Sequence, residues 1–486
     1  MGPQRAFRHS LTLLTLAFSC YASAQPAITF FAVAKSLSAS LTVVPRRRIV
    51  SQFGGFGSIN FAGSVVQSNG TTQLTGTDRF HWSPNCDCMN PSFVFINGYT
   101  DGALGGLCTI NPNGNIVNFN MVVEEGSGLY PVHFPGYTDA SMSPGGHTAI
   151  TIGDGQMLES KPRQMGLLRA GSTQTFRVYH VVSKGEKWCY NLAAGYGGVN
   201  FINTSDPVNG ISDTSGADYT QTYSKMGGAP RSSCYTFGPQ VILGDQPPGH
   251  PVEVVMIAGD SIAFGYGSVP YEGYLGLALG DANIAFHNDG LSGVSLQNLS
   301  LYDEMGLFLA PYVDDIALNC GTNDFHNGEP LAQVQGYLEE YALSHCMQGA
   351  NLHISTCLPR TSGAWSSPSG QSLPTWEATR IQWNNWLRDT TATGAKQMIN
   401  AALTAEGCLG RVVQIIDPCL GVEVNAAGQS LTLSGSGPNQ QSSTAGGYWG
   451  TLNGAPLTLD GTHPNPAGQA KAAAAVVTSA SYWYAH

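Results

Sequence analysis

Charged side chains are scarce in this chain and make up 11% of its 486 residues. Positively charged residues are fewer than negatively charged ones: the chain has 21 Lys and Arg and 32 Asp and Glu, and its formal net charge is −11. Proteins that bind nucleic acid or anionic membranes do so through clustered Lys and Arg. The composition therefore argues against a nucleic-acid partner and against an anionic membrane surface.

Long apolar runs are missing as well. The run from Leu11 to Phe18 is shorter than the roughly 20 residues that a membrane-spanning helix needs, so we expect no membrane span. It follows Arg5 and Arg8 and precedes Ala22-Ser23-Ala24, which is the layout of a cleavable secretory signal peptide. We therefore expect residues 1–24 to be a signal peptide and the protein to be secreted or periplasmic.

Cysteines at metal-ligand spacing are also lacking. Cys86-Asp87-Cys88 near His81 could form a metal cluster, but no second pair follows at the spacing of a zinc site, so we expect no metal and no other cofactor. Ten cysteines follow the leader, and an even number in an exported chain favours disulfides, whose pairing the spacing does not define. Five fall in each half of the chain, and we expect Cys320 to be the free thiol of the second half.

No helix of three turns is recognisable between residues 25 and 245. Short alternating runs, interrupted about every ten residues by Gly, Asn, Ser or Pro, are typical of half-buried strands. The clearest of these runs are 93–96, 116–123, 147–152 and 175–182. We expect residues 25–245 to form an all-β, sandwich-like accessory domain, in which a second small β unit after about residue 190 is an alternative.

A linker at residues 246–251 separates this part from a different kind of sequence, because its three prolines can continue neither a sheet nor a helix. Beyond the linker, apolar runs alternate with helical patterns. The expected strands are Val252–Ile257, Asn283–His287, Asp315–Asn319, Asn351–Thr356 and Val412–Ile416. An alanine-rich helix should follow Asn465 as its N-cap and run to about Ser479. This alternation predicts an α/β fold for residues 252–486, with three α/β/α layers around a five-stranded parallel sheet.

The Gly-x-Ser-x-Gly turn of α/β-hydrolases is absent. Four other short blocks occur in order, each at the carboxyl end of an expected strand or in the last loop. They are Gly259-Asp260-Ser261, Asn288 to Gly293, Gly321-Thr322-Asn323-Asp324, and Asp460-Gly461-Thr462-His463-Pro464. Because parallel strands present their carboxyl ends at one edge of the sheet, we expect the blocks to converge there.

Together the blocks hold the parts of a serine esterase. Ser261 needs a base, and His463 follows Asp460 by three residues, so the carboxylate can orient the imidazole toward the serine. A tetrahedral intermediate also needs hydrogen-bond donors for its oxyanion. The backbone N–H groups of Ser261 and Gly293 and the side-chain amide of Asn323 are the candidates.

This ordered set resembles the SGNH (GDSL-like) hydrolases, a superfamily of esterases, lipases and carbohydrate deacetylases. The resemblance covers residues 252–486 and implies a flavodoxin-like sheet, Ser261 as nucleophile with Asp460 and His463, and Ser261, Gly293 and Asn323 as the oxyanion hole. The long stretch 422–459 departs from the family pattern. Within it, Tyr448 and Trp449 are weaker candidates for stacking on a sugar.

The resemblance implies a secreted ester hydrolase that removes small acyl groups, acetyl above all, from a polysaccharide. Several secreted deacetylases of this kind pair the catalytic domain with a β domain. A lipid or aryl esterase is the alternative, but the catalytic half has no long apolar stretch for a lipid-binding lid. A non-catalytic glycan-binding or surface-structural protein is an alternative of another class, against which stand the intact Ser261, Asp460, His463 and Asn323.

Overall fold

The computed structural model describes residues 46–51, 65–66, 73–99, 111–112, 114, 116–126, 128–137, 150–183, 187–188, 212–213, 238–267, 273–433 and 446–479. The expected signal peptide, residues 1–24, lies outside these ranges. So do Cys108, Cys189 and Cys234, and most of the stretch after residue 190 in which a second β unit is the alternative.

In the described residues before position 246, every regular element is a β-strand, as the alternating pattern predicts. One antiparallel sheet has the order β1 (Arg47–Ile49), β14 (Val241–Asp245), β4 (Met89–Ile96), β10 (Met157–Glu159). The other runs β13 (Ser212–Asp213), β3 (Gln73–Trp82), β11 (Gln174–Ser183), β7 (Val117–Glu125), β8 (Gly128–Pro131), and β9 (Ile150–Ile152) also pairs with β7. Short pairs join β2 (Val65–Val66) to β12 (Lys187–Trp188) and β5 (Gly98–Tyr99) to β6 (Asn111–Pro112).

Aromatic side chains join the two antiparallel sheets. The ring of Phe93 on β4 lies 5.6 Å from that of Phe176 on β11. Phe95, two residues further along β4, lies 4.4 Å from Phe119 on β7. Because residues two apart on a strand share one face, these contacts pack one sheet against the other. The expected all-β, sandwich-like part is confirmed.

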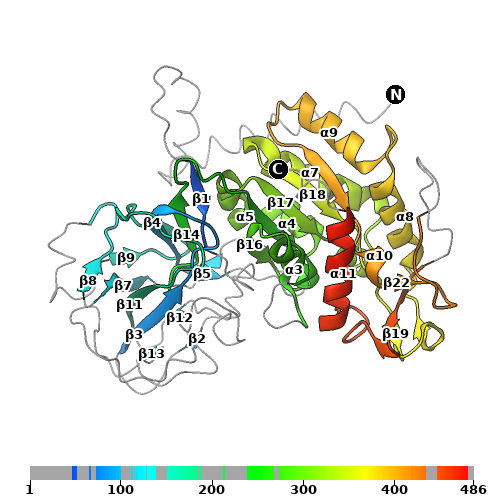
Figure 1. The fold of residues 1–486 in the computed structure, drawn as a ribbon, viewed down its shortest axis with the longest axis horizontal. Helices are drawn as coiled ribbons and strands as arrows, with labels where there is room; N and C mark the ends of the chain where they lie inside the picture. Colours follow the sequence, from blue (N-terminus) through cyan, green and yellow to red (C-terminus); the bar gives the residue numbers. More distant parts are fainter. Residues whose placement is uncertain are drawn as a thin grey trace. The chain divides into compact units, whose positions relative to one another are not determined.

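A five-stranded parallel sheet forms the centre of the second part (Figure 1). Its order is β16 (Ala285–Gly290), β15 (Val254–Gly259), β17 (Asp315–Asn319), β18 (Asn351–Ser355), β21 (Val412–Ile416). In chain order this is 2-1-3-4-5, the doubly wound arrangement of flavodoxin-like folds. The predicted fold class is confirmed, and β17 and β21 have the predicted bounds.

Helices cover both faces of this sheet. One face carries α3 (Gly273–Asp281), α10 (Cys419–Val422) and α11 (Pro466–Ser479). The other carries α4 (Leu296–Tyr302), α5 (Glu304–Leu309), α7 (Leu331–His345), α8 (Glu377–Arg388) and α9 (Ala395–Ala405). The two shortest helices, α2 (Ser261–Phe264) and α6 (Thr322–His326), follow β15 and β17 directly.

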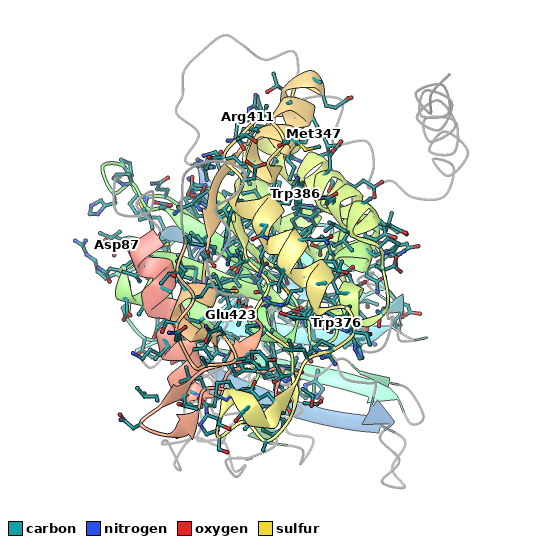
Figure 2. All side chains as sticks on the ribbon, turned by 90° about the vertical axis from the view of Figure 1, so that its right-hand side faces the viewer. Asp87, Met347, Trp376, Trp386, Arg411 and Glu423 are labelled. Atoms are coloured by element: carbon teal, nitrogen blue, oxygen red, sulfur yellow. The ribbon has the colours of Figure 1, made fainter. Side chains whose placement is uncertain are left out.

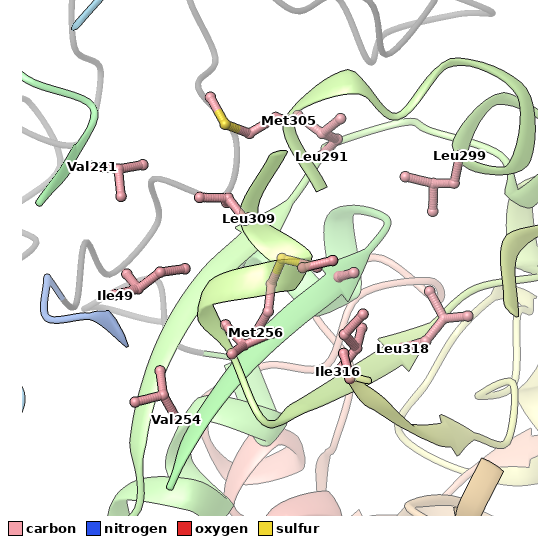
Figure 3. Packing of buried hydrophobic residues seen from close by; sticks show 14 of the residues in the cluster. Ile49, Val241, Val254, Met256, Leu291, Leu299, Met305, Leu309, Ile316 and Leu318 are labelled. Carbon is pink, nitrogen blue, oxygen red and sulfur yellow. The ribbon is translucent and has the colours of Figure 1, made fainter. Parts of the chain in front are cut away.

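The interior strand β15 buries side chains on both of its faces. Val255 and Ile257 belong to the apolar cluster that includes α3 and α11. Val254 and Met256 belong to the opposite cluster, where they lie near Ile316 of β17 (Figure 3). Burial on both faces explains why the strand is a continuous apolar run rather than an alternating one.

Strand β15 extends two residues beyond its predicted end, through Gly259. A Cβ at Gly259 would lie 1.8 Å from the carbonyl oxygen of Asn319, and the backbone φ there is +136°. Only glycine permits this close approach of β15 to β17. The close approach brings the residue after the strand, Asp260, and then Ser261 to the sheet edge beside β17.

Between β14 and β15 the chain forms no strand or helix, as the prolines of the predicted linker require. Side chains from before this segment nonetheless contact the parallel-sheet part. Arg48 forms an ion pair with Asp314, and Asn85 donates a hydrogen bond to the carbonyl of Phe286 (3.1 Å). The boundary at 246–251 between independently folding domains stays a prediction.

A buried ion cluster ties α8 to the segment that leads into the last loops. The fully buried guanidinium of Arg380 donates to Glu377, on the same helix, and to Glu423 at 2.7 Å. Glu423 is labelled in Figure 2, as are Trp376 and Trp386. Glu423 begins β22 (Glu423–Val424), which pairs with β23 (Tyr448–Trp449). Removing one partner of such a buried pair costs about 3–5 kcal/mol, so the cluster holds β22, and through it the β22–β23 pair, against α8.

The expectation of disulfides is not met among the described cysteines. All seven of them are free and buried: Cys86, Cys88, Cys320, Cys346, Cys357, Cys408 and Cys419. Burial raises the pKa of these thiols, to about 12 for Cys346 and Cys357. Cys320 is free as expected, but so are the other four of its half. Each packs as a small apolar side chain in the core, a role that spacing along the chain does not distinguish from pairing.

Candidate active site

Ser261 stands where β15 leaves the sheet. Asp260 accepts a hydrogen bond from the N–H of Ile262 (2.8 Å) and so caps α2, of which Ser261 is the first residue. The Ser261 side chain is only 8% exposed, but its Oγ faces a histidine from the far end of the chain. The strand and the cap therefore hold the hydroxyl in one place at the carboxyl edge of the sheet.

The structure brings Ser261, His463 and Asp460 into one hydrogen-bonded chain. Ser261 Oγ lies 2.8 Å from His463 Nε2, and His463 Nδ1 lies 2.7 Å from Asp460 Oδ2. Asp460 Oδ1 also accepts from the N–H of Thr462 and of His463. Partial burial alone would raise the pKa of Asp460, but these hydrogen bonds outweigh it and hold the pKa below its usual range. A carboxylate only accepts, so Nδ1 carries the imidazole proton and Nε2 can accept that of Ser261.

Trp449 packs against the loop that carries Asp460 and His463, and its ring does not face solvent. Its side chain is fully buried, and its Nε1 donates to the carbonyl of Gly461 (2.8 Å). The N–H of Thr361 donates to the same carbonyl (2.8 Å). A stacking platform for sugar needs an exposed ring face, which Trp449 does not have. The stacking role of its half-buried neighbour Tyr448 stays a prediction.

Three hydrogen-bond donors at the carboxyl edge of the sheet are not fully used within the described part of the chain. The backbone N–H groups of Ser261 and Gly293 meet no acceptor there. Asn323 donates from Nδ2 to the carbonyl of Val294 (2.8 Å), which uses one of its two amide hydrogens. Gly293 has a φ of +86°, a conformation that favours glycine. The three donors predicted from the sequence therefore come from three neighbouring strand ends, and each keeps one hydrogen free.

Asp324 fixes the Gly293 turn to the Asn323 turn. Its two carboxylate oxygens accept from the N–H of Leu296 (2.9 Å) and of Gln297 (3.1 Å), the first residues of α4. Helix α4 begins three residues after Gly293. The Asp324 bridge and the Asn323–Val294 hydrogen bond therefore set the distance between the Gly293 N–H and the Asn323 amide.

We expect Asp324→Ala to lower stability by about 1–2 kcal/mol, because two buried N–H groups lose their acceptor. The same variant should lose about 10-fold or more in kcat for ester hydrolysis, because a displaced donor stabilises an oxyanion less. Urea unfolding and initial-rate kinetics measure the two effects. Asp303→Ala is the control: Asp303 caps α5 through the N–H of Gly306 (2.9 Å), pairs with His345 Nε2 (3.1 Å), and should affect stability alone. Equal activity losses in both variants would contradict the bridging role.

Asp260 is buried at 1% exposure beside Ser261 and has one carboxylate oxygen, Oδ2, without a partner in the described structure. Burial raises the pKa of Asp260 to about 7, although hydrogen bonds from Ile262 and from Asn319 (3.0 Å) oppose the shift. A buried carboxyl of this kind is neutral in acid and is forced to ionise in base.

We expect Asp260→Asn to change how stability depends on pH. The folded carboxyl holds its proton up to about pH 7, whereas the unfolded one releases it near 3.8. The stability that Asp260 contributes is therefore complete below 3.8 and is lost as the pH rises through about 7. Relative to wild type, the variant should gain at least about 1 kcal/mol between pH 4.5 and pH 8. Parallel urea titrations measure the difference, and parallel pH curves would contradict the shift.

Two residues near the site were not found from the sequence. The ring of Tyr266 lies 4.6 Å from that of His463, and Tyr266 is exposed. Arg360 follows β18 and precedes Thr361, which bonds to the Gly461 loop. Neither belongs to a recognisable motif. The position of Arg360 in the loop after β18, at the sheet edge where three of the blocks follow strands, was the available indication.

The other histidines near the blocks differ in exposure. His287 is buried, and its Nδ1 lies 3.2 Å from the carbonyl of Ser51, which is a structural contact. His326 is exposed at the end of α6.

No group of three His, Cys, Asp or Glu side chains in the described ranges is placed to hold a metal ion, and the side chain of His81 lies outside them. Within the same ranges no helix is long and apolar enough to cross a membrane.

Comparison with known proteins gives structural similarity only. No protein-family model matches the chain, and no curated protein sequence does. Among solved structures, a family two carbohydrate esterase from Clostridium thermocellum in complex with cellohexaose aligns at 10% identity and TM-score 0.27, over 86% of this chain and 98% of its own. A psychrotrophic esterase from Pseudoalteromonas sp. aligns at 14% and 0.29, over 48% and 100%. A member of the lipolytic G-D-S-L family from Veillonella parvula aligns at 17% and 0.29, over 47% and 97%.

These alignments are too distant to carry an argument, so the classification depends on this chain's own features. Those features are the 2-1-3-4-5 parallel sheet and the four blocks, which follow β15, β16 and β17 and precede α11. The described residues of this part, 252–267, 273–433 and 446–479, have a flavodoxin-like α/β/α fold, which is the fold that the resemblance to the SGNH (GDSL-like) hydrolases implies.

Proposed function

We propose that the protein is a serine esterase, and the observation that carries this proposal is the hydrogen-bonded chain from Ser261 through His463 to Asp460 beside three free donors. In this mechanism His463 Nε2 takes the Ser261 proton as Oγ attacks the ester carbonyl carbon. The carbonyl oxygen gains negative charge and accepts hydrogen bonds from the Ser261 and Gly293 N–H groups and from the Asn323 amide.

The intermediate then collapses with cleavage of the ester C–O bond. His463 returns the proton to the leaving alcohol oxygen, and the acyl group stays on Ser261 Oγ. A water molecule, deprotonated by His463, attacks the acyl carbon, and the carboxylic acid leaves as Ser261 regains its proton. Asp460 keeps its charge throughout and stabilises the imidazolium that forms twice in each turnover.

The proposed substrate is a small acyl ester, acetyl above all, on a polysaccharide outside the cytoplasm. The signal-peptide pattern at residues 1–24 and the β-sandwich part that precedes the esterase fold support this substrate. The composition supports it too, because neither the charge nor the apolar runs favour a lipid surface.

Acetate release from a panel of acetylated glycans tests the substrate, with a p-nitrophenyl series from acetate to octanoate run beside it. We expect acetate release from at least one glycan and the highest kcat/KM on the acetyl ester. A rise in kcat/KM toward octanoate would instead support the lipid or aryl esterase. Hydrolysis of none of these esters would favour a non-catalytic glycan-binding or surface-structural protein.

A further inference from the structure

Arg360 lies at the same sheet edge as the proposed nucleophile. It follows β18, and the adjacent Thr361 donates a backbone hydrogen bond to Gly461 of the His463 loop (2.8 Å). Since β15, β17 and β18 are parallel neighbours, the residues just past their ends share one edge. The backbone of Arg360 is therefore fixed beside the loop that carries Asp460 and His463.

The guanidinium of Arg360 interacts electrostatically with residues of two of the blocks and with His326. Burial lowers its pKa, and attraction to Asp260 and Asp460 offsets part of that effect. Burial and the charge of Arg360 in turn lower the pKa of His326, three residues after Asn323. The guanidinium of Arg360 is therefore within electrostatic range of Asp260, Asp460 and His326.

This guanidinium has no hydrogen-bond or ion-pair partner in the described part of the chain, although the side chain is half-buried. Its nitrogens are not among the buried unpartnered atoms, so solvent reaches them. The other arginines of the parallel-sheet part are satisfied: Arg380 by Glu377 and Glu423, Arg388 by Asp417, Arg411 by backbone carbonyls. A partly desolvated, unpaired guanidinium favours binding an anion, above all a carboxylate that matches its planar fork.

We propose that Arg360 is a specificity-determining residue that binds a carboxylate on the substrate, so that the preferred ester carries one negative charge close to the scissile bond. This inference rests on the proposed esterase function. The net charge of −11 opposes a polyanion, so it favours a substrate with an isolated carboxylate, such as an acetylated acidic sugar unit.

Two pairs of synthetic esters of similar size, in which one member carries a carboxylate and the other is neutral, test the proposal on the intact chain. On the alcohol side, 4-acetoxybenzoate is compared with 4-acetoxybenzamide. On the acyl side, mono-4-nitrophenyl glutarate is compared with 4-nitrophenyl pentanoate. We expect wild type to prefer the anionic member of one pair, and the pair shows on which side of the ester the carboxylate binds.

We expect Arg360→Met to lose about 10- to 100-fold in kcat/KM on the preferred anionic ester and less than about 3-fold on its neutral partner. Most of the loss should be in KM, because the contact is made before and during reaction. Arg360→Lys should recover part of the preference, since it keeps the charge and loses the fork. Arg169→Met is the control, because it removes one positive charge from the β part.

Equal losses on charged and neutral esters, or no loss on either, would overturn the proposal. A second test needs only wild type: benzoate should inhibit p-nitrophenyl acetate hydrolysis competitively and at least about 10-fold more strongly than benzamide. Equal inhibition would also overturn it. If wild type hydrolyses the neutral esters without preferring the charged ones, this inference fails alone. If wild type hydrolyses neither, the proposed function fails first.

Discussion

Ser261→Ala should lose about 10⁴- to 10⁶-fold in kcat for ester hydrolysis, because no other group in the site can form the acyl-enzyme. The methyl group that remains still fits the first turn of α2, whose cap comes from Asp260 and not from the serine. Stability should therefore change little. Initial rates on p-nitrophenyl acetate together with urea unfolding measure both quantities.

The control for this variant is Ser344→Ala. Ser344 lies on α7, and its Oγ donates to the carbonyl of Tyr341 within the same helix (2.9 Å). It should keep the wild-type rate. Hydrolysis by Ser261→Ala at the wild-type rate would show that another residue is the nucleophile.

Asp460→Asn should lower kcat by about 10³- to 10⁴-fold, the second largest expected effect. The amide fits the same space, and its oxygen can still accept from the N–H groups of Thr462 and His463. Its NH₂ group, however, donates, so it favours the tautomer in which Nδ1 accepts and Nε2 carries the proton. That tautomer cannot accept the Ser261 proton, and the imidazolium also loses its counter-charge.

The Asp460→Asn variant distinguishes a role in orienting the His463 imidazole from a role in binding the substrate. KM should stay within about 3-fold of wild type while kcat falls, because Asp460 acts through His463 and not on the substrate. Asp389→Asn is the control, since Asp389 accepts, within the described residues, from Thr391 and Thr393 in the loop after α8. A fall in kcat of less than about 10-fold for Asp460→Asn would mean that another group orients the imidazole.

The parallel sheet was predictable because its strands have runs of apolar residues. Ile316, Ala317 and Leu318 form the middle of Asp315–Asn319, Val412–Ile416 is apolar except at Gln414, and the structure gives both strands the predicted bounds. The error at β15 arose at Gly259, where small residues ended the apolar run before the strand itself ended. Apolar content marks burial, whereas the strand end depends on the approach of β17, which is a tertiary contact.

The residues of the candidate site were predictable as a set because their blocks follow strand ends. Two features of the site could not be predicted from the sequence. Trp449 lies in a Gly-rich loop, which suggested an exposed ring, and only the structure shows that its Nε1 supports Gly461. Arg360 has no motif around it, and its significance comes from lacking a partner, which a sequence cannot reveal.

The thiols illustrate the same limit of local patterns. An even number of cysteines in an exported chain favours pairing, yet the described ones are buried and free. Pairing requires two sulfurs at a defined distance and angle, and this is set by packing around the sheet rather than by spacing along the chain.

Covalent labelling tests the central claim most directly. A fluorophosphonate ester reacts with a serine hydroxyl only when a base removes the proton and donors stabilise the anion that forms. Mass spectrometry of wild type should find one adduct, on Ser261, and the adduct should be absent from Ser261→Ala and formed far more slowly in His463→Ala. An unlabelled wild-type protein, or an adduct on another residue, would contradict the account.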